Sequence, residues 1–199
     1  MIQVYQVVIL VLSAVVHEYM HGWMAYRLGD STAKDAGRLT MNPLAHLEWF
    51  GSFFLPLVMI FGNFPFVIGW AKPVPYNPYN LEDKKYGEAK VAAAGPLANL
   101  VIALVFGLFL RWSPFYNLEF FGFISLIVFI NLVLMVFNLI PIPPLDGSKI
   151  LASFLPDNLR DRYLGLEKMG FILVILFVML GGSLIMPLVN LLFRFILGS

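Results

Sequence analysis

The chain has 199 residues, of which 60% are hydrophobic and 13% are charged, and it contains no cysteine. Soluble domains are roughly 45–50% apolar and about 25% charged, so this composition excludes an ordinary soluble fold and indicates an integral membrane protein. The 13 basic and 12 acidic residues almost cancel, which leaves no basic surface for a nucleic acid. The absence of cysteine excludes disulfides and thiolate metal ligands. We expect one domain over residues 1–199, embedded in the lipid bilayer.

Four apolar stretches can cross a hydrocarbon layer about 30 Å thick as helices. They comprise residues 2–24, 91–112, 120–140 and 169–197. Two glycines at 181 and 182, followed by Pro187, interrupt the last stretch, which can form one kinked helix or two helices. Between the first two stretches, Asn80 and Asp83 have the spacing of a helix N-terminus, which predicts a helix that starts near Leu81.

Residues 50–70 are also apolar, but glycine and proline break them into short pieces. This segment can cross the membrane, or it can enter and return on the same side. If it returns, 11 of the 13 basic residues lie on one side, and only Arg111 and Arg194 lie elsewhere. Cytoplasmic loops carry such an excess of basic residues. We therefore predict an all-α polytopic membrane protein of about five to six membrane helices, with a re-entrant element near 50–70, short extended interfacial segments and a cytoplasmic basic face.

The first apolar stretch contains an H-E-x-x-H sequence, His17-Glu18-Tyr19-Met20-His21. Residues four apart lie on one face of a helix, so His17 and His21 can share a metal ion while Glu18 reaches a water molecule beside it. Polar groups within a membrane helix are costly and indicate function. The alternative is a polar cluster at the membrane surface, in which Glu18 pairs with Arg27 or with a lipid head group.

A catalytic zinc site needs three protein ligands and one open position. The candidates for the third ligand are His46, in a loop, and Asp146, which follows a proline-rich segment at the end of a membrane helix. An Asp-Gly pair after prolines is usually only a turn. Beside the histidine pair, however, Asp146 is the best candidate. The re-entrant topology places His17, His21 and Asp146 on one side of the membrane, whereas a full crossing would separate them.

These residues resemble the site-2 protease family of intramembrane zinc metalloproteases, especially its compact bacterial and archaeal members without PDZ or CBS domains. The resemblance covers His17–His21, Asn42–Leu44 with Gly51–Pro56, Gly69–Val74, Ala94–Asn99 and Asn138–Gly147.

The resemblance implies that Zn²⁺ is bound by His17, His21 and Asp146. It also implies that Glu18 is the general base and that Asn138 supports the substrate or the oxyanion, although Asn138 can equally cap its helix. In this family an extended segment receives the substrate as an added strand, and residues 36–41 are the candidate here. We interpret Gly95 and Asn99 as residues of close helix packing.

The implied function is a hydrolase, an intramembrane zinc endopeptidase of regulated intramembrane proteolysis. It would cut single-pass membrane protein substrates within or near their transmembrane segments, in the cell membrane of a prokaryote, with its active site towards the cytoplasm. Two other functions are considered, a catalytically silent membrane binding module and a metal-ion transporter. An intact Glu18 argues against the silent module. A transport path needs more polar residues than the first stretch offers before His17.

Overall fold

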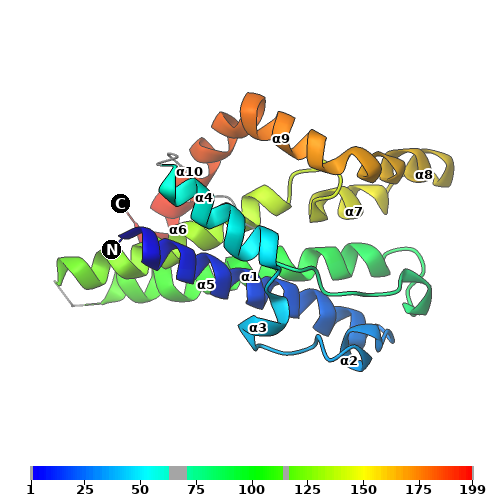
Figure 1. The fold of residues 1–199 in the computed structure, drawn as a ribbon, viewed down its shortest axis with the longest axis horizontal. Helices are drawn as coiled ribbons and strands as arrows, with labels where there is room; N and C mark the ends of the chain where they lie inside the picture. The colour runs from blue at the N-terminus through cyan, green and yellow to red at the C-terminus, as the bar shows by residue number, and fades with distance from the viewer. Residues whose placement is uncertain (1, 63–70, 114–116, 199) are drawn as a thin grey trace.

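The computed structural model describes residues 2–62, 71–113 and 117–198, and these residues form helices and connecting segments without any β-strand. The long helices run side by side, and several of the shorter ones lie at the end of the bundle far from the two chain termini (Figure 1). The α-helices are α1 (Ile2–Arg27), α2 (Thr32–Asp35), α3 (Pro43–His46), α4 (Leu55–Phe61), α5 (Gly87–Trp112), α6 (Leu118–Asn138), α7 (Asp146–Ala152), α8 (Asp157–Gly165), α9 (Gly170–Gly181) and α10 (Ile185–Leu197). The prediction of an all-α polytopic protein is confirmed.

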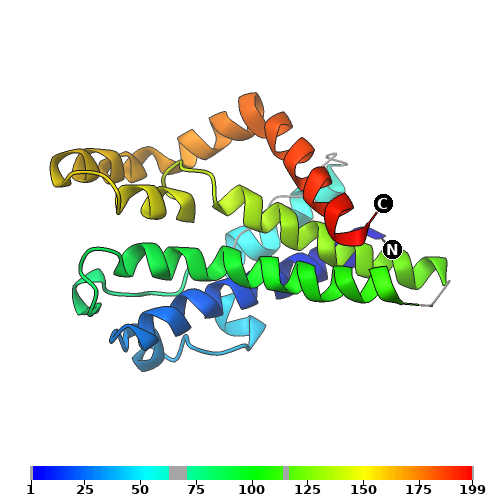
Figure 2. The ribbon, with the colours of Figure 1, turned by 180° about the vertical axis from the view of Figure 1, so that it is seen from behind.

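Among the residues that the structure describes, four helical segments are long and apolar enough to cross a membrane, against the five to six membrane helices expected. They are Val4–Arg27, Gly87–Trp112, Leu118–Asn138 and Asp157–Leu197. The last of these contains α8, α9 and α10. A 3₁₀ turn over Gly182–Leu184 separates α9 from α10, and the two helices meet at a sharp bend (Figure 2). The segment that could form one kinked helix or two therefore forms two.

Helix α5 is the centre of the bundle, because it packs against both α1 and α6. Its C-terminal half, with α6 and α10, builds the main apolar core. The fully or nearly buried members of this core are Ala103, Val128, Leu132, Met135, Val136, Ile185, Val189 and Ile196. Gly107 lets α10 approach closely, since an added Cβ atom would collide with the side chain of Ile196. Small residues at such crossings allow membrane helices to pack tightly.

The two ends of the segment 47–71 meet. The backbone N–H of Lys72 donates a hydrogen bond of 2.8 Å to the carbonyl oxygen of His46. The π-helix Trp49–Phe54 and helix α4 directly after it together have 13 residues, roughly 20 Å at 1.5 Å per residue, which is shorter than a hydrocarbon layer of about 30 Å. The chain therefore leaves and returns at one level of the bundle, as the re-entrant prediction requires. Residues 63–70 of this predicted element lie outside the described part.

The connections between the spans fall into two groups at opposite ends of the bundle. Helices α2, α7 and α8 lie at the end far from the two chain termini (Figure 1). An ion pair between Arg160 of α8 and Glu88 of α5 joins elements of this end. Arg111 lies at the other end, where its guanidinium donates to the carbonyl oxygen of Phe195. The basic loops are thus grouped on one side, as the charge pattern predicts.

The helix predicted to start near Leu81 begins instead at Gly87. Asn80 does not cap a helix, because its side-chain amide donates to Asp30 at 2.9 Å. Asp83 accepts hydrogen bonds from the backbone N–H groups of Lys85 and Tyr86, and so forms a turn before the helix. The local pattern predicted that the Asn80 side chain caps a helix, but this side chain bonds to Asp30 in another segment instead.

Asp30 is fully buried just after α1 and joins three segments. Its carboxylate accepts hydrogen bonds from Thr32, from the backbone N–H of Asn77 at 2.7 Å and from the side chain of Asn80. Burial by itself raises the pKa of Asp30, but these hydrogen bonds outweigh burial and hold the pKa below its ordinary value.

Replacing Asp30 by alanine is expected to lower the free energy of unfolding by about 2–4 kcal/mol, because buried donors lose their acceptor. The lowered pKa adds stability above the unfolded value of about 3.9, and this part is lost as the pH falls through the folded value. Thermal unfolding of the protein in detergent at about pH 7 and about pH 3 measures both effects. Asp35→Ala, at an exposed position, is the control and should unfold like the wild type. An Asp30→Ala protein as stable as this control would contradict the prediction.

Candidate metal centre

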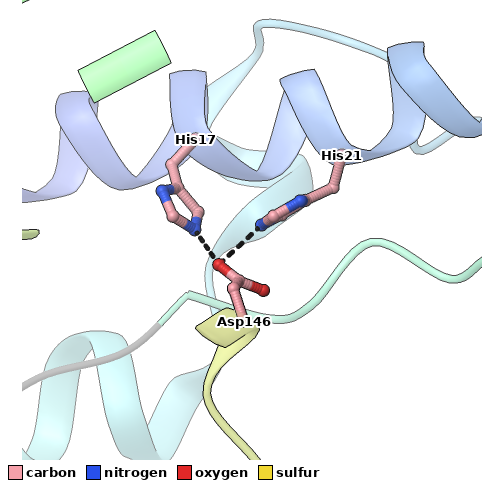
Figure 3. A group of neighbouring side chains, drawn as sticks. All are labelled: His17, His21 and Asp146. Carbon is pink, nitrogen blue, oxygen red and sulfur yellow. Dashed lines mark hydrogen bonds and ion pairs between the residues drawn. The ribbon is translucent and has the colours of Figure 1, made fainter. Parts of the chain in front are cut away.

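Helix α1 presents two imidazoles to the aspartate that begins α7 (Figure 3). The Nε2 atoms of His17 and His21 lie 3.1 Å and 3.2 Å from the same oxygen, Oδ2 of Asp146. The three ligand atoms lie within 4.8 Å of one another. The structure therefore brings together the two motif histidines and the aspartate that the sequence singled out, over a separation of 129 residues.

Asp146 is the first residue of α7, and the close approach of the next residue to the end of α6 fixes its position. A Cβ atom at the next residue, Gly147, would collide with the carbonyl group of Leu139, so only glycine allows the chain to pass so close to the end of α6. Burial alone raises the pKa of Asp146, but the neighbouring His21 and His17 outweigh it and hold the pKa well below its ordinary value. The side chain is thus a carboxylate, the form that binds metals.

Each imidazole uses its other nitrogen for a fixed hydrogen bond. Nδ1–H of His17 donates to Oδ1 of Asn99 at 2.6 Å, and Nδ1–H of His21 donates to the carbonyl oxygen of Val91 at 2.7 Å. These partners, both on α5, keep the proton on Nδ1 and leave the lone pair of Nε2 towards the site. Metal-binding histidines are oriented by such outer hydrogen bonds.

Asn99 belongs to a buried chain of hydrogen bonds through three membrane helices. Its amide donates to Oδ1 of Asn131 at 2.9 Å, and the Asn131 amide donates to the hydroxyl of Ser13 at 3.0 Å. Asn99 and Asn131 are both fully buried. The packing role expected for Asn99 is therefore accompanied by a direct contact with His17.

We expect Asn99→Leu to weaken zinc binding by about 10–100-fold, because His17 loses the acceptor that orients its ring. A chelator-competition titration of the purified protein measures this affinity. Asn131→Leu is the matched control, since it disturbs the same chain one link further from His17 and should have a smaller effect. Equal zinc affinity in the Asn99→Leu variant and the wild type would refute a positioning role.

Gly95 lies on α5 directly against the two histidines. A Cβ atom added there would be 2.5 Å from Nε2 of His21 and 2.6 Å from Nε2 of His17. Such distances are far inside van der Waals contact. Gly95 therefore keeps open the space between the two metal-binding atoms, a role beyond the helix packing expected from the sequence.

Glu18 lies beside the triad but takes no part in it. Its Oε2 accepts a hydrogen bond of 2.9 Å from the backbone N–H of Val74, in the extended segment after the re-entrant element. Gly22 gives Val74 room, because a Cβ atom at Gly22 would be 2.8 Å from the Val74 side chain. This contact holds Glu18 at the mouth of the site.

A cavity of about 160 Å³ opens from this triad. The titratable or amide side chains around it are His17, Glu18, His21, Tyr76, Asn138, Asp146 and Lys149. Asn138 ends α6, and its amide donates to the carbonyl oxygen of Leu134 at 2.9 Å. The site thus combines three possible metal ligands, a neighbouring carboxylate and an open space.

Two other predicted features are not part of the triad. His46 is fully buried and its Nε2–H donates to the carbonyl oxygen of Thr40 at 2.7 Å, so it supports the loop rather than the site. Residues 36–41 form a turn and an irregular segment and have no β-strand partner among the described residues. Arg38 of this segment donates to the carbonyl oxygen of Lys72, the residue before Pro73 in the cavity wall.

The donor set fits a zinc ion. In a tetrahedral site with bonds of about 2.0–2.1 Å, ligand atoms are about 3.3 Å apart, close to the observed distances between the imidazoles and Asp146. Two histidines with one carboxylate form a known class of catalytic zinc site and leave one position open. The two fixed Nδ1–H groups and the space left by Gly95 suit the same ion.

The fold and this site define a polytopic membrane protein with an H-E-x-x-H metal centre. The chain belongs to peptidase family M50, whose family model matches residues 5–119 and 113–182, and it is accordingly a zinc metalloprotease. A Bacillus subtilis protein, YwhC, provisionally named as a zinc metalloprotease, is 36% identical over 94% of this chain and 86% of its own length. The Mycolicibacterium smegmatis protein Rip2, named in the same way, is 32% identical over 82% of this chain and 62% of its own length. No solved structure shows a significant match to the chain.

The sequence analysis assigned no role in the site to Val74, Tyr76, Val91 or Lys149. Val74 and Val91 contribute only a backbone N–H and a backbone carbonyl group to the site. Because nearly every residue type has these groups, the sequence does not single them out. Lys149 had one available signal, its position three residues after Asp146, on the same face of a helix.

Proposed function

We propose that this protein is an intramembrane endopeptidase that hydrolyses peptide bonds within or near the transmembrane segments of single-pass membrane proteins. The observation that carries the proposal is the depth of the metal centre. His21 and His17 lie six and ten residues before the end of α1, roughly 9–15 Å along the helix axis. That depth along a helix long enough to span a membrane supports a reaction below the membrane surface.

In the proposed reaction, His17, His21 and Asp146 hold the zinc ion. Zinc held there supplies a Lewis acid that lowers the pKa of a water molecule to about 7 and polarises a carbonyl group. Glu18 accepts one proton from the attacking water and later gives it to the leaving amine as the C–N bond breaks. The Val74 N–H fixes one oxygen of Glu18, which leaves the other oxygen for this proton. Asn138 binds the substrate backbone beside the reacting bond.

We further propose that the protein lies in the cell membrane of a prokaryote, with the metal centre towards the cytoplasm. The metal centre lies nearer the end of the bundle that carries the basic loops, and an excess of Lys and Arg is typical of cytoplasmic loops. A helical substrate has its backbone groups already paired, so it must unwind locally before cleavage. The extended segments around the cavity offer backbone groups to the unwound strand.

Purified protein in detergent with a panel of single-pass model substrates tests the function. We expect zinc-dependent cleavage, abolished by a chelator and restored by added Zn²⁺, at sites that mass spectrometry maps within or next to the apolar segment. Bound zinc without cleavage would favour the silent binding module. Absence of bound zinc would overturn the metal site itself.

A further inference from the structure

One ammonium group lies in the wall of the catalytic cavity. Lys149 and Asp146 are three residues apart on α7, so their side chains leave the same face of the helix, and both line the cavity with Glu18. The Nζ atom of Lys149 lies 5.2 Å from the centroid of the Tyr76 ring, which lines the cavity as well. The aromatic face holds the cation at the site.

Within the part of the chain that the structure describes, no carboxylate is close enough to Lys149 to form a salt bridge with it. Burial by itself lowers the pKa of Lys149, but neighbouring Tyr76 and Asp146 outweigh burial and raise the pKa, so the side chain is charged at neutral pH. A partly buried cation without a direct carboxylate partner is costly. Negative charge that forms beside Lys149 during the reaction would offset this unfavourable free energy of burial.

Peptide hydrolysis generates such a charge. The water oxygen forms a bond to the carbonyl carbon while Glu18 takes the water proton, and the π electrons of the C=O bond move to the carbonyl oxygen. When the C–N bond breaks, these electrons return and the amine takes the proton from Glu18. The carbonyl oxygen therefore carries negative charge only between these two events, when a nearby fixed cation stabilises it most.

We propose that Lys149, positioned by the ring of Tyr76, donates a hydrogen bond to the oxygen of the scissile carbonyl as its negative charge develops. Lys149 is then a catalytic residue and Tyr76 a positioning residue. The inference rests on the proposed peptidase function. It differs from the role of Asn138, whose amide already donates within its own helix.

The test compares Lys149→Met and Lys149→Arg with the wild type on one cleavable single-pass substrate. We expect Lys149→Met to lower kcat by about 10²–10³-fold with little change in KM, while Lys149→Arg, which keeps the charge, recovers most of the rate. Zinc content and thermal unfolding should match the wild type. In the Glu18→Gln background, where the substrate stays uncut, its binding should change less than about threefold. Lys168→Met, at an exposed position away from the cavity, is the control.

Each other outcome overturns the inference. A wild-type kcat in Lys149→Met removes the catalytic role, and a rise of KM alone assigns Lys149 to ground-state binding instead. Loss of zinc or of thermal stability assigns it to the architecture of the site. Cleavage by the wild type separates these failures from failure of the proposed function, since a wild type that cuts no substrate overturns both.

Discussion

Replacing Glu18 by glutamine is expected to lower kcat by about 10²–10⁴-fold while the bound zinc remains. Glutamine keeps an oxygen that can accept the hydrogen bond from Val74, but it cannot take a proton from water. The triad of His17, His21 and Asp146 does not include Glu18 and stays intact. Cleavage rates and zinc content of the purified variant, measured side by side, test both halves of this expectation.

His17→Ala is the matched comparison, because it removes a predicted ligand and should lose zinc and activity together. The two variants thus separate the base from the metal site. A Glu18→Gln protein that cuts at more than a tenth of the wild-type rate would exclude Glu18 as the base. Loss of zinc from this variant would show that Glu18 belongs to the metal site instead.

Gly95→Ala is expected to abolish the site although it adds a single methyl group. The new Cβ atom would be 2.5 Å from His21 Nε2 and 2.6 Å from His17 Nε2, so the two imidazoles and α5 cannot all keep the positions that form the site. We expect zinc affinity to fall by more than the 10–100-fold that is typical of outer contacts, that is by at least about 100-fold, and cleavage to fall to background. Chelator competition and the cleavage assay measure the two effects.

Gly122→Ala provides the control for a methyl group in a membrane helix. Gly122 lies on α6, where an added Cβ would have no atom of another packed segment within 4 Å among the described residues, and alanine is the better helix former. This variant should therefore bind zinc and cut substrate like the wild type. Wild-type zinc affinity in Gly95→Ala would mean that α5 can shift away from α1 without cost, and that Gly95 does not shape the site.

The apolar helices and their order in the bundle could be predicted largely from the sequence. Apolar length and the distribution of lysine and arginine predicted both the membrane spans and the return of segment 50–70, and the hydrogen bond between Lys72 and His46 agrees with that return. The start of α5 was predicted six residues too early, because Asn80 bonds to Asp30 across 50 residues. A capping pattern describes only neighbouring residues, so it cannot predict that a residue of another segment binds the same side chain.

The residues of the site also fall into those that a local sequence pattern identifies and those that depend on the fold. H-E-x-x-H is a local pattern whose geometry follows from the pitch of one helix, so His17, His21 and Glu18 could be recognised from the amino-acid sequence alone. Asp146 could be nominated because few other ligands exist in the chain, and its placement needed only the topology. Their roles as zinc ligands and base stay predictions that the variants above can test.

The amino-acid sequence by itself determined the class of protein, its helical spans and the H-E-x-x-H residues, because hydrophobicity and helical periodicity act over short distances along the chain. Only the tertiary structure decided what surrounds those residues. It set Asn99 and Val91 behind the two histidines, Gly95 in the gap between their Nε2 atoms, and Tyr76 with Lys149 in the cavity wall. These contacts join residues 70 or more positions apart, and the close packing of α1, α5 and α7 creates them rather than any pattern along the chain.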